Sequence, residues 1–320
     1  VHQETRMEFG LHLPASSAGV TAQDLIRFAQ SAEALGFYCI TVADHVIVPK
    51  SISIPYPYTV DGKYPGTGYH LETLMTMGFL AGSTRRIRFV TSVMIAPYRN
   101  PIITAKMLAS LDVLSQGRVI VGLGVGWMKE EFENLQAPNF TERGKVTDEY
   151  IHAFRELWTK DNPSFNGKYC RFSDIVFIPK PVQQPTIPIW IGGHSKQAIR
   201  RAARLGDGWH PIGGVPTIPL EPEDMKRDLA LLAEFADAAG RDPKKIRVAL
   251  KGSLFDKEKK IEGRRRHFMG SAEDIAADIR AYRDVGVDTM IFDVRRPSFS
   301  ETLERMEWMA TEVIAKATSE

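Results

Sequence analysis

The 320-residue sequence contains only two cysteines, Cys39 and Cys170, and no long hydrophobic run. Two cysteines are too few for the disulfide framework of a small secreted protein, so we expect a reducing compartment. The longest uninterrupted apolar stretch, Val119 to Met128, is about half the ~20 residues that a membrane-spanning helix needs. The first residues, Val1 to Arg6, are polar and lack the apolar segment of a secretion signal, and we therefore expect a cytoplasmic protein.

An excess of charge of either sign is also missing. The chain has 41 Lys and Arg against 39 Asp and Glu, which gives a net charge of +2. Nucleic acids and anionic membranes bind concentrated basic faces, and this composition predicts neither partner. With 43% hydrophobic residues the chain can bury a large core, and small molecules are its expected ligands. No Pro- or Ser-rich linker divides it, so residues 1–320 are interpreted as one domain.

What the sequence does contain is a regular alternation of short β-rich segments and longer segments with helical spacing of their apolar residues. Eight strands are predicted, at 7–14, 38–44, 87–95, 118–126, 187–193, 207–213, 246–254 and 288–294. The predicted helices span 21–35, 71–83, 101–116, 143–159, 195–205, 222–239, 272–286 and 299–317. Several strands, such as VIVGLGV, are apolar at nearly every position, which is typical of parallel strands covered by helices on both faces. Eight such units with right-handed crossovers predict an α/β fold, the (β/α)8 TIM barrel.

Three connections are longer than ordinary barrel loops, and long ordered loops often carry function. They are insertions after strand 2 (45–70), before strand 5 (161–186) and after strand 7 (255–270). The first and third leave the C-terminal ends of strands, where barrel enzymes hold their active sites, so we expect them to cover the site. The third carries basic residues at 257, 259, 260 and 264–266, which either contact an anionic ligand or form a solvated charged loop.

Polar residues at the C-terminal ends of the predicted strands are the candidates for chemistry. Asp44 and His45 follow strand 2, and an acid beside an imidazole suits proton transfer near neutral pH, although the pair also fits a cap and a structural histidine. Strand 5 leads into a helix through Gly192, Gly193, His194 and Ser195. Amides at a helix N-terminus without Cβ atoms in the way bind phosphate, whereas a tight turn alone would also explain the glycines.

The end of strand 4 reads Gly-Leu-Gly-Val-Gly-Trp from Gly122 to Trp127. It is not the dinucleotide-binding fingerprint, because G-x-G-x-x-G needs a glycine where Trp127 stands and belongs to the first strand of a doubly wound sheet. We interpret the glycines, Gly126 among them, as letting a flat ring or a phosphate approach the backbone. Strand 6 brings Trp209 and His210 to the same end of the barrel.

These strand ends, taken in order, resemble the luciferase-like family of flavin- and deazaflavin-dependent oxidoreductases, which is built on this barrel. The resemblance runs through AEALGFYCITVADH (32–45), TRRIRFVTSVMIAPYRNPIITAKMLASLDVLSQGRVIVGLGVGW (84–127), ERGKVTDEYIHAFRELW (142–158) and PVQQPTIPIWIGGHSKQAIRRAARLGDGWHP (181–211). It implies an oxidoreductase that uses coenzyme F-420 for hydride transfer or reduced FMN for monooxygenation, and the Asp-His pair favours F-420. It also implies a homodimer, and a separate flavin reductase as partner if FMN is used.

The resemblance transfers roles to matching residues. Members that use F-420 carry an Asp-His pair after strand 2, which implies that His45 is catalytic and that Asp44 contacts the cofactor. Members with either cofactor have a non-prolyl cis peptide at the end of strand 3, and Ser92 and Val93 occupy that position, behind the expected ring. The phosphate-bearing tail lies near the ends of strands 4 and 5, which implies a phosphate site at 192–195, in agreement with the amide argument.

The sequence says less about the substrate than about the cofactor. Members that oxidise sugar phosphates have a carboxylate directly after the strand 4 glycine, where this chain has Trp127, so a sugar phosphate is not the expected substrate. Aromatic side chains gather instead near the barrel end. They indicate either an apolar or aromatic substrate or simply a closed barrel mouth, and they are Trp127, Trp209, Tyr56, Tyr58, Tyr64 and Tyr69.

Two other functions remain open from the sequence. A metal-dependent barrel hydrolase would use His45, His194 and His210, but such enzymes usually begin with H-x-H on strand 1, where this chain has only His12. A barrel that binds a flavin without turnover would need the phosphate site and no proton donor at His45. Binding spectra and metal analysis would separate these classes.

Overall fold

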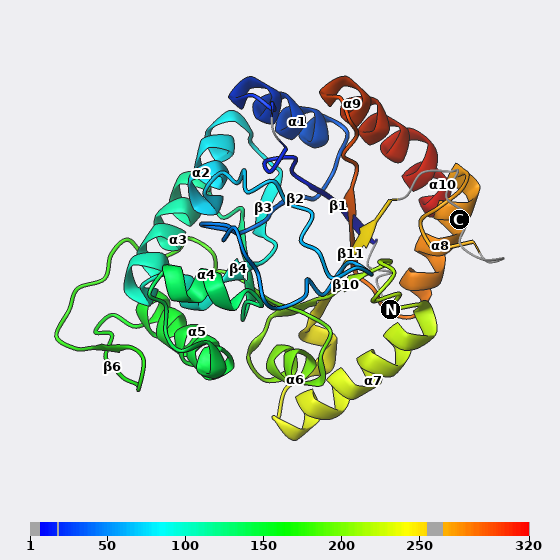
Figure 1. The fold of residues 1–320 in the computed structure, drawn as a ribbon. Coiled ribbons are helices and arrows are strands. Elements are labelled where there is room, and N and C mark those ends of the chain that lie inside the picture. The colour runs from blue at the N-terminus through cyan, green and yellow to red at the C-terminus, as the bar shows by residue number, and fades with distance from the viewer. Residues whose placement is uncertain (1–6, 18, 255–264, 320) are drawn as a thin grey trace.

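Most strands of the described chain form one closed parallel sheet with helices around it (Figure 1). This computed structural model describes residues 7–17, 19–254 and 265–319. The barrel positions are held in chain order by β1 (Glu8–His12), β2 (Cys39–Val42), β3 (Arg88–Thr91), β5 (Val119–Gly124), β8 (Ile189–Gly192), β9 (Gly208–His210), β11 (Arg247–Ser253) and β12 (Thr289–Asp293). Each strand pairs with the next, and β12 pairs with β1, which closes the barrel. The predicted TIM barrel is confirmed.

The eight predicted helices are all present, and their ends follow local sequence signals. In chain order they are α1 (Ala22–Ala34), α2 (Thr73–Ser83), α3 (Pro101–Ser115), α5 (Arg143–Thr159), α6 (Lys196–Leu205), α7 (Pro222–Ala238), α8 (Ala272–Asp284) and α9 (Phe299–Trp308), the last continuing as a π-helical segment (Met309–Ile314) and α10 (Ala315–Thr318). Thr21 and Asp24 form a capping box at the start of α1, and Gly36 after its end has a φ of +83°. Such reciprocal caps satisfy backbone N–H groups that have no partner inside the helix.

Several short elements divide the predicted strands or lie between the predicted elements. The strand expected at 87–95 is divided into β3 and β4 (Met94–Ile95), and the Ser92–Val93 peptide bond between them is cis, as the resemblance predicts. A short β10 (Ile212–Gly213) follows β9. Helix α4 (Lys129–Asn134) follows the end of β5 at the C-terminal end of the barrel. The insertion before strand 5 contains an antiparallel hairpin of β6 (Phe165–Asn166) and β7 (Arg171–Phe172), which stands apart from the barrel in Figure 1.

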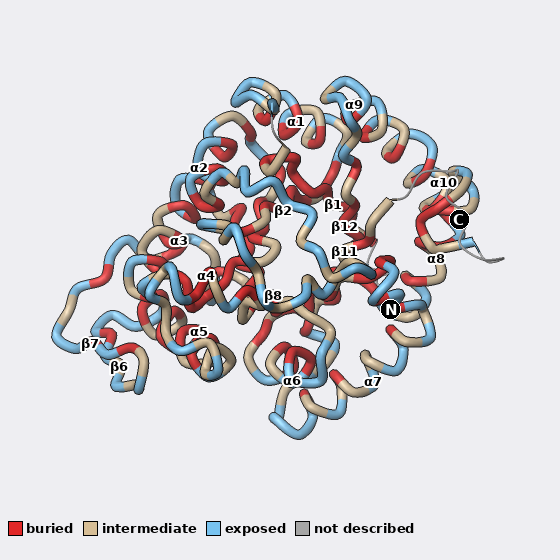
Figure 2. The backbone as a smooth tube through the Cα atoms, in the orientation of Figure 1, coloured by how far each residue is buried: buried red, intermediate tan, exposed pale blue. Residues whose placement is uncertain are grey.

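The barrel interior has an apolar layer below a polar one. The apolar layer is made of Cys39, Val90, Ile120, Trp190, Ala249 and Ile291. Two residues further along β1, β2, β11 and β12, where the strand periodicity returns to the same face, the side chains are His12, Thr41, Lys251 and Asp293. Figure 2 shows the barrel strands mostly as buried and the outer helix faces as exposed. The polar layer is therefore the floor of the C-terminal end of the barrel.

Within the residues that the structure describes, no helix is long and apolar enough to cross a membrane. The basic residues of the third insertion up to Arg264 lie outside the described residues, so the two interpretations of that loop stay open.

Candidate active site

A cavity of about 510 Å³ opens at the C-terminal ends of the strands. This volume falls within the range of roughly 300–1,000 Å³ that is typical of small-molecule sites. Several predicted site residues line it, namely Asp44, His45, Ser92, Val93, Trp127, Gly192 and Gly193. The structure therefore brings together residues from β2, the β3–β4 junction, the end of β5 and the end of β8.

The insertion after β2 crosses the open end of the barrel (Figure 1). Its Ser53 donates a backbone hydrogen bond to Glu130 on α4, and Thr217, after β10, donates to the carbonyl of Pro57. Its aromatic rings form a wall of the cavity, where Tyr56 lies 5.2 Å from Trp127, centroid to centroid. The segment is thus anchored on two sides of the barrel and covers the site, as predicted.

His45 is oriented by a buried carboxylate that comes from a different element. Its Nδ1 lies 2.8 Å from Oε2 of Glu131 on α4, whose side chain is fully buried. Tyr98 donates to the same oxygen at 2.9 Å, and the backbone N–H groups of Val46 and Ile47 donate to the other. Because a carboxylate fixes the proton on Nδ1 of a neutral imidazole, Nε2 is left as the proton-accepting atom. His45 lines the cavity, and among the described residues only its Nδ1 has a hydrogen-bond partner, which leaves Nε2 as the nitrogen for proton transfer.

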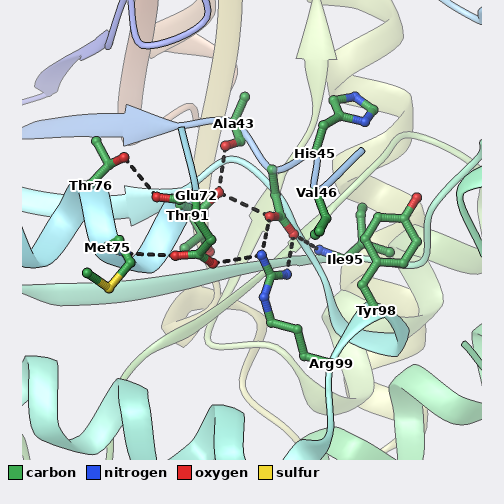
Figure 3. A network of polar contacts seen from close by, with 12 residues as sticks. Ala43, His45, Val46, Glu72, Met75, Thr76, Thr91, Ile95, Tyr98 and Arg99 are labelled. Carbon is green, nitrogen blue, oxygen red and sulfur yellow. Dashed lines mark hydrogen bonds and ion pairs between the residues drawn. The ribbon is translucent and has the colours of Figure 1, made fainter. Parts of the chain in front are cut away.

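Asp44 is held by protein groups on both oxygens. Arg99 makes a bidentate pair with it at 2.7 and 2.8 Å and also contacts Glu72 (Figure 3). Oδ2 accepts the N–H of Ile95 and Oδ1 accepts the hydroxyl of Thr73. Four donors use the four lone-pair positions of a carboxylate. Asp44 therefore fixes Arg99 and the start of β4. Asp44 also lines the cavity, and the cofactor contact that the resemblance implies for it stays a prediction.

Ser92 has its hydrogen-bond role set by His210. Nδ1 of His210 lies 2.6 Å from the carbonyl oxygen of Ala249, so it carries the proton, and Nε2 accepts the Ser92 hydroxyl at 2.9 Å. Burial lowers the pKa of His210 to about 4, which keeps the ring neutral at pH 7. With its proton committed to His210, the Ser92 oxygen presents only lone pairs to the cavity.

Val93 explains two of the strand-end glycines. A Cβ on Gly124 would lie 2.5 Å from a Val93 methyl, and a Cβ on Gly192 would lie 2.7 Å from the other methyl. These glycines make room for the Val93 side chain, which lines the cavity. Gly126 has a φ of +84°, and its Cβ would meet Phe132 at 2.6 Å. Tight packing therefore accounts for Gly126, which is not among the residues that line the cavity, and its predicted cofactor contact is not supported by its position.

The predicted phosphate site at 192–195 is partly a helix cap. Ser195 is the N-cap of α6 and accepts the N–H of Ala198 at 3.2 Å. The other N–H groups of a first helical turn have no partner inside the helix. Gly193 has a φ of +99° and lines the cavity. Nδ1 of His194 is buried without a hydrogen-bond partner in the described part of the chain. An unpaired buried nitrogen beside open helix amides fits the cofactor phosphate proposed there.

Trp209 does not line the cavity. Its ring is fully buried in the core, and its indole N–H donates to the carbonyl of Gly193 at 2.7 Å. The predicted substrate contact is therefore replaced by a structural one, in which Trp209 supports the loop that carries Gly193. Trp127 does line the cavity, together with Tyr56, Tyr58 and Tyr64.

Some site residues were not found from the sequence. Glu131 lies 86 residues from His45. Lys251 lies on β11 and Arg295 follows β12, and the ends of these two strands were not analysed for function. Lys251 is a charged residue that directly follows the apolar run VAL inside the strand RVALKGS, and this was the available signal for that strand. Helix α4 was not predicted, so nothing in the sequence placed Glu131 against His45.

Two of the three histidines considered for a metal site, His45 and His210, are engaged elsewhere. His45 is paired with Glu131, and His210 is held by Ser92 and Ala249. Across the described ranges, no group of three or more His, Cys, Asp or Glu side chains is arranged to hold a metal ion. The hydrolase alternative thus has no ligand set in this part of the protein.

Comparison with known proteins identifies the family. The model of the luciferase-like monooxygenase family matches residues 7–267. This chain belongs to that family. An uncharacterised protein of Mycobacterium tuberculosis is 32% identical over 295 residues, covering 91% of this chain and 94% of that protein. The predicted resemblance is confirmed.

Relatives with stated activities include users of both cofactor types. The F-420-dependent glucose-6-phosphate dehydrogenase of Amycolatopsis mediterranei is 27% identical, covering 87% of this chain and 90% of that protein. The FMNH2-dependent dimethylsulfone monooxygenase of Pseudomonas putida is 32% identical over 52% of this chain and 46% of its own length. In structure, a monooxygenase from Streptomyces bottropensis matches with a TM-score of 0.78 and 24% identity, covering 96% of this chain and 99% of that one. The family is thus one of flavin-type oxidoreductases, and its fold is the fold found here.

Proposed function

We propose that this protein is an F-420-dependent oxidoreductase in which His45 takes the proton of a substrate hydroxyl while a hydride leaves the adjacent carbon. The observation that carries the proposal is the orientation of His45 in the cavity, with Nδ1 held by buried Glu131 and Nε2 left for the substrate. Removal of a hydride from an alcohol carbon yields a carbonyl only if the hydroxyl proton is also removed. A base positioned at the cavity supplies that function.

The residues present fit a flavin-type cofactor. The Val93 side chain, Ser92 and the ends of β5 and β8 line one face of the cavity, and Gly193 with the N-terminus of α6 fits the phosphate tail. When bound, a deazaflavin supplies a two-electron hydride acceptor. The Ser92 oxygen would accept an N–H from a bound cofactor, because its own proton is committed to His210. Trp127 and the tyrosines of the covering segment exclude water and contact an apolar or aromatic substrate.

Reduced FMN is the second candidate, because one relative is FMNH2-dependent. In that case the reaction would be a monooxygenation that needs a separate flavin reductase as partner. A homodimer is part of the proposal with either cofactor.

Titration of the purified protein with F-420, FMN and reduced FMN under anaerobic conditions tests the proposal. Trp127 lines the cavity, so tryptophan fluorescence reports binding, and Trp127→Phe identifies its share of the signal. We expect F-420 to bind more tightly than either form of FMN. Loss of the F-420 absorbance in the presence of apolar or aromatic secondary alcohols then measures hydride transfer. Tight binding of reduced FMN alone would replace the dehydrogenase by the monooxygenase, and binding of neither would contradict both.

A further inference from the structure

The floor of the cavity carries cations that the chemistry at His45 does not use. Lys251 on β11 and Arg295 after β12 both line the cavity. Nζ of Lys251 lies 3.2 Å from Nδ1 of His12, and Arg295 is paired with Asp293 at 2.5 Å. Asp293 is the one carboxylate of the described residues that lines this side, so two cations share a single anion.

Asp293 is paired with Arg295, and the neighbouring groups do not neutralise the charge of Lys251. Burial lowers the pKa of His12 and of His210, which keeps both rings neutral at pH 7. Burial also lowers the pKa of Lys251 to about 8, with Arg295 adding to the shift, while Asp293 opposes it. The floor therefore holds close to one excess positive charge. On the opposite side, Arg99 is paired with two carboxylates, Asp44 and Glu72, and Glu131 is paired with His45, so carboxylates outnumber the cations there. An anion in the cavity is favoured at the Lys251 side only.

Both cations have hydrogen-bond donors to spare. Arg295 has five N–H groups, and the described residues take up three of them, through Asp293 and Ser16. Lys251 uses one of its N–H groups at His12. An arginine fork held by a carboxylate and a buried lysine beside it match the two oxygens of a carboxylate.

The aromatic wall lies next to these donors. Burial raises the pKa of Tyr56 and raises that of Tyr64 to about 12, and the guanidinium of Arg295 acts on both hydroxyls in the opposite direction. Tyr56 and Tyr64 contact each other and Trp127, with ring centroids 5.2–6.0 Å apart. A ligand anchored at Arg295 would therefore place its uncharged part against flat apolar surfaces.

We propose that Lys251 and Arg295 form an anion subsite, so that the substrate is an organic acid whose carboxylate binds there and whose apolar or aromatic body lies against Tyr56 and Trp127. The inference rests on the proposed function in that the same cavity holds the substrate. The subsite selects for a negative charge that the aromatic wall alone would not recognise.

Calorimetric titration with benzoate and with its neutral analogue benzamide tests the subsite, with the protein alone and saturated with F-420. We expect benzoate to bind at least about tenfold more tightly than benzamide at pH 7 in one of these forms. Lys251→Met and Arg295→Gln should each weaken benzoate binding about tenfold to a hundredfold and leave benzamide unchanged. Lys63→Met removes an exposed charge from the covering segment and should change neither. Arg295→Lys keeps the charge, so partial recovery of benzoate binding separates charge recognition from loss of folding, and thermal unfolding of each variant checks the latter.

The affinity for benzoate should also fall as the pH rises through about 8, where Lys251 loses its proton. The groups that face Lys251 are His12, His210, Asp293 and Arg295, and none of these changes its charge near pH 8. Equal binding of benzoate and benzamide, or no binding of benzoate in either form, overturns the subsite. So does a loss of F-420 or FMN binding in the two variants with benzoate unaffected, which would assign the cations to the cofactor. Because F-420 reduction is not measured, the subsite can hold while the proposed hydride transfer fails.

Discussion

The two sides of the cavity differ in how much of their hydrogen-bonding capacity the protein itself uses. On the His45 side, Asp44 and Glu131 each accept four hydrogen bonds from protein groups. On the Lys251 side, Lys251 and Arg295 keep donors that the described residues do not take up. Saturated groups hold geometry, whereas groups with free donors bind ligands. The comparison assigns orientation of the catalytic base to one side and recognition of substrate to the other.

Replacing His45 by alanine should have the largest effect. General acid–base catalysis commonly contributes about 10²–10⁴-fold in rate, so turnover should fall by that factor while cofactor affinity changes far less. The measurement is kcat with an alcohol found in the F-420 screen, beside the fluorescence titration. His152→Ala, on the exposed face of α5, is the matched control. Turnover within a few-fold of wild type together with a collapse of F-420 binding would make His45 a binding residue.

Glu131→Gln tests whether the saturated side acts through His45. The amide keeps the size of the side chain, but it places an NH2 group where His45, Tyr98 or a backbone N–H now donates. We expect kcat to fall by about 10–100-fold, as for other groups that orient a ligating or catalytic histidine, with a change in the pH profile of kcat. The control is Glu130→Gln, because Glu130 also ties the covering segment to α4, by accepting a hydrogen bond from Ser53. If both variants lower kcat equally and leave the pH profile unchanged, the role of Glu131 is to anchor the segment.

The difference between the two sides also explains which parts of the site the sequence predicted. His45, Ser92 and Val93 lie at or near strand ends and together line the cavity. The alternation of strands and helices placed His45 there, whereas Ser92 and Val93 were selected through the family resemblance. Glu131 was missed because its helix has only six residues and no strong periodicity. The glycines at 124 and 192 were assigned to ligand approach, although their reason is the side chain of Val93, which only the packed structure shows.

The whole barrel was predictable for a related reason. Each of its strands is buried on both faces or nearly so, as in β5, where all six residues are buried, and this leaves a continuous apolar pattern. Helix ends such as Thr21 and Gly36 follow local rules. Charge balance inside the cavity depends on side chains from β1, β11 and β12 meeting at one layer, and no local pattern encodes such a meeting.

His210→Gln tests whether His210, beside the ligand-binding floor, is kept neutral in the folded protein. The pKa of His210 is lowered from 6.5 to about 4 by burial, so the unfolded chain binds a proton that the folded protein does not between these values. Wild-type stability therefore is fully present above pH 6.5 and falls as the pH drops toward 4. From pH 7 to pH 5 the His210 contribution is roughly 2 kcal/mol. Urea unfolding at pH 7 and pH 5 measures the free energy of unfolding, and its decrease at pH 5 should be smaller in the variant than in wild type by that amount. Equal decreases in the two proteins would show that His210 is not kept neutral.

Gly193→Ala should give the smallest of these effects, and it tests whether the open amides at α6 bind the cofactor. Gly193 has a φ of +99°, and an added Cβ would lie 3.2 Å from the Cβ of Ala198. Gly240 has a φ of +68° with nothing within 4 Å of its Cβ position, so Gly240→Ala carries a similar backbone cost far from the cavity. Both variants should lose about 1 kcal/mol of stability from the unfavourable φ. Only Gly193→Ala should weaken F-420 binding, by about tenfold, because a shift of this turn misaligns the N–H groups that would meet the phosphate. An equal and small change of F-420 affinity in both variants would remove residues 192–195 from the cofactor site and leave Ser195 as a helix cap alone.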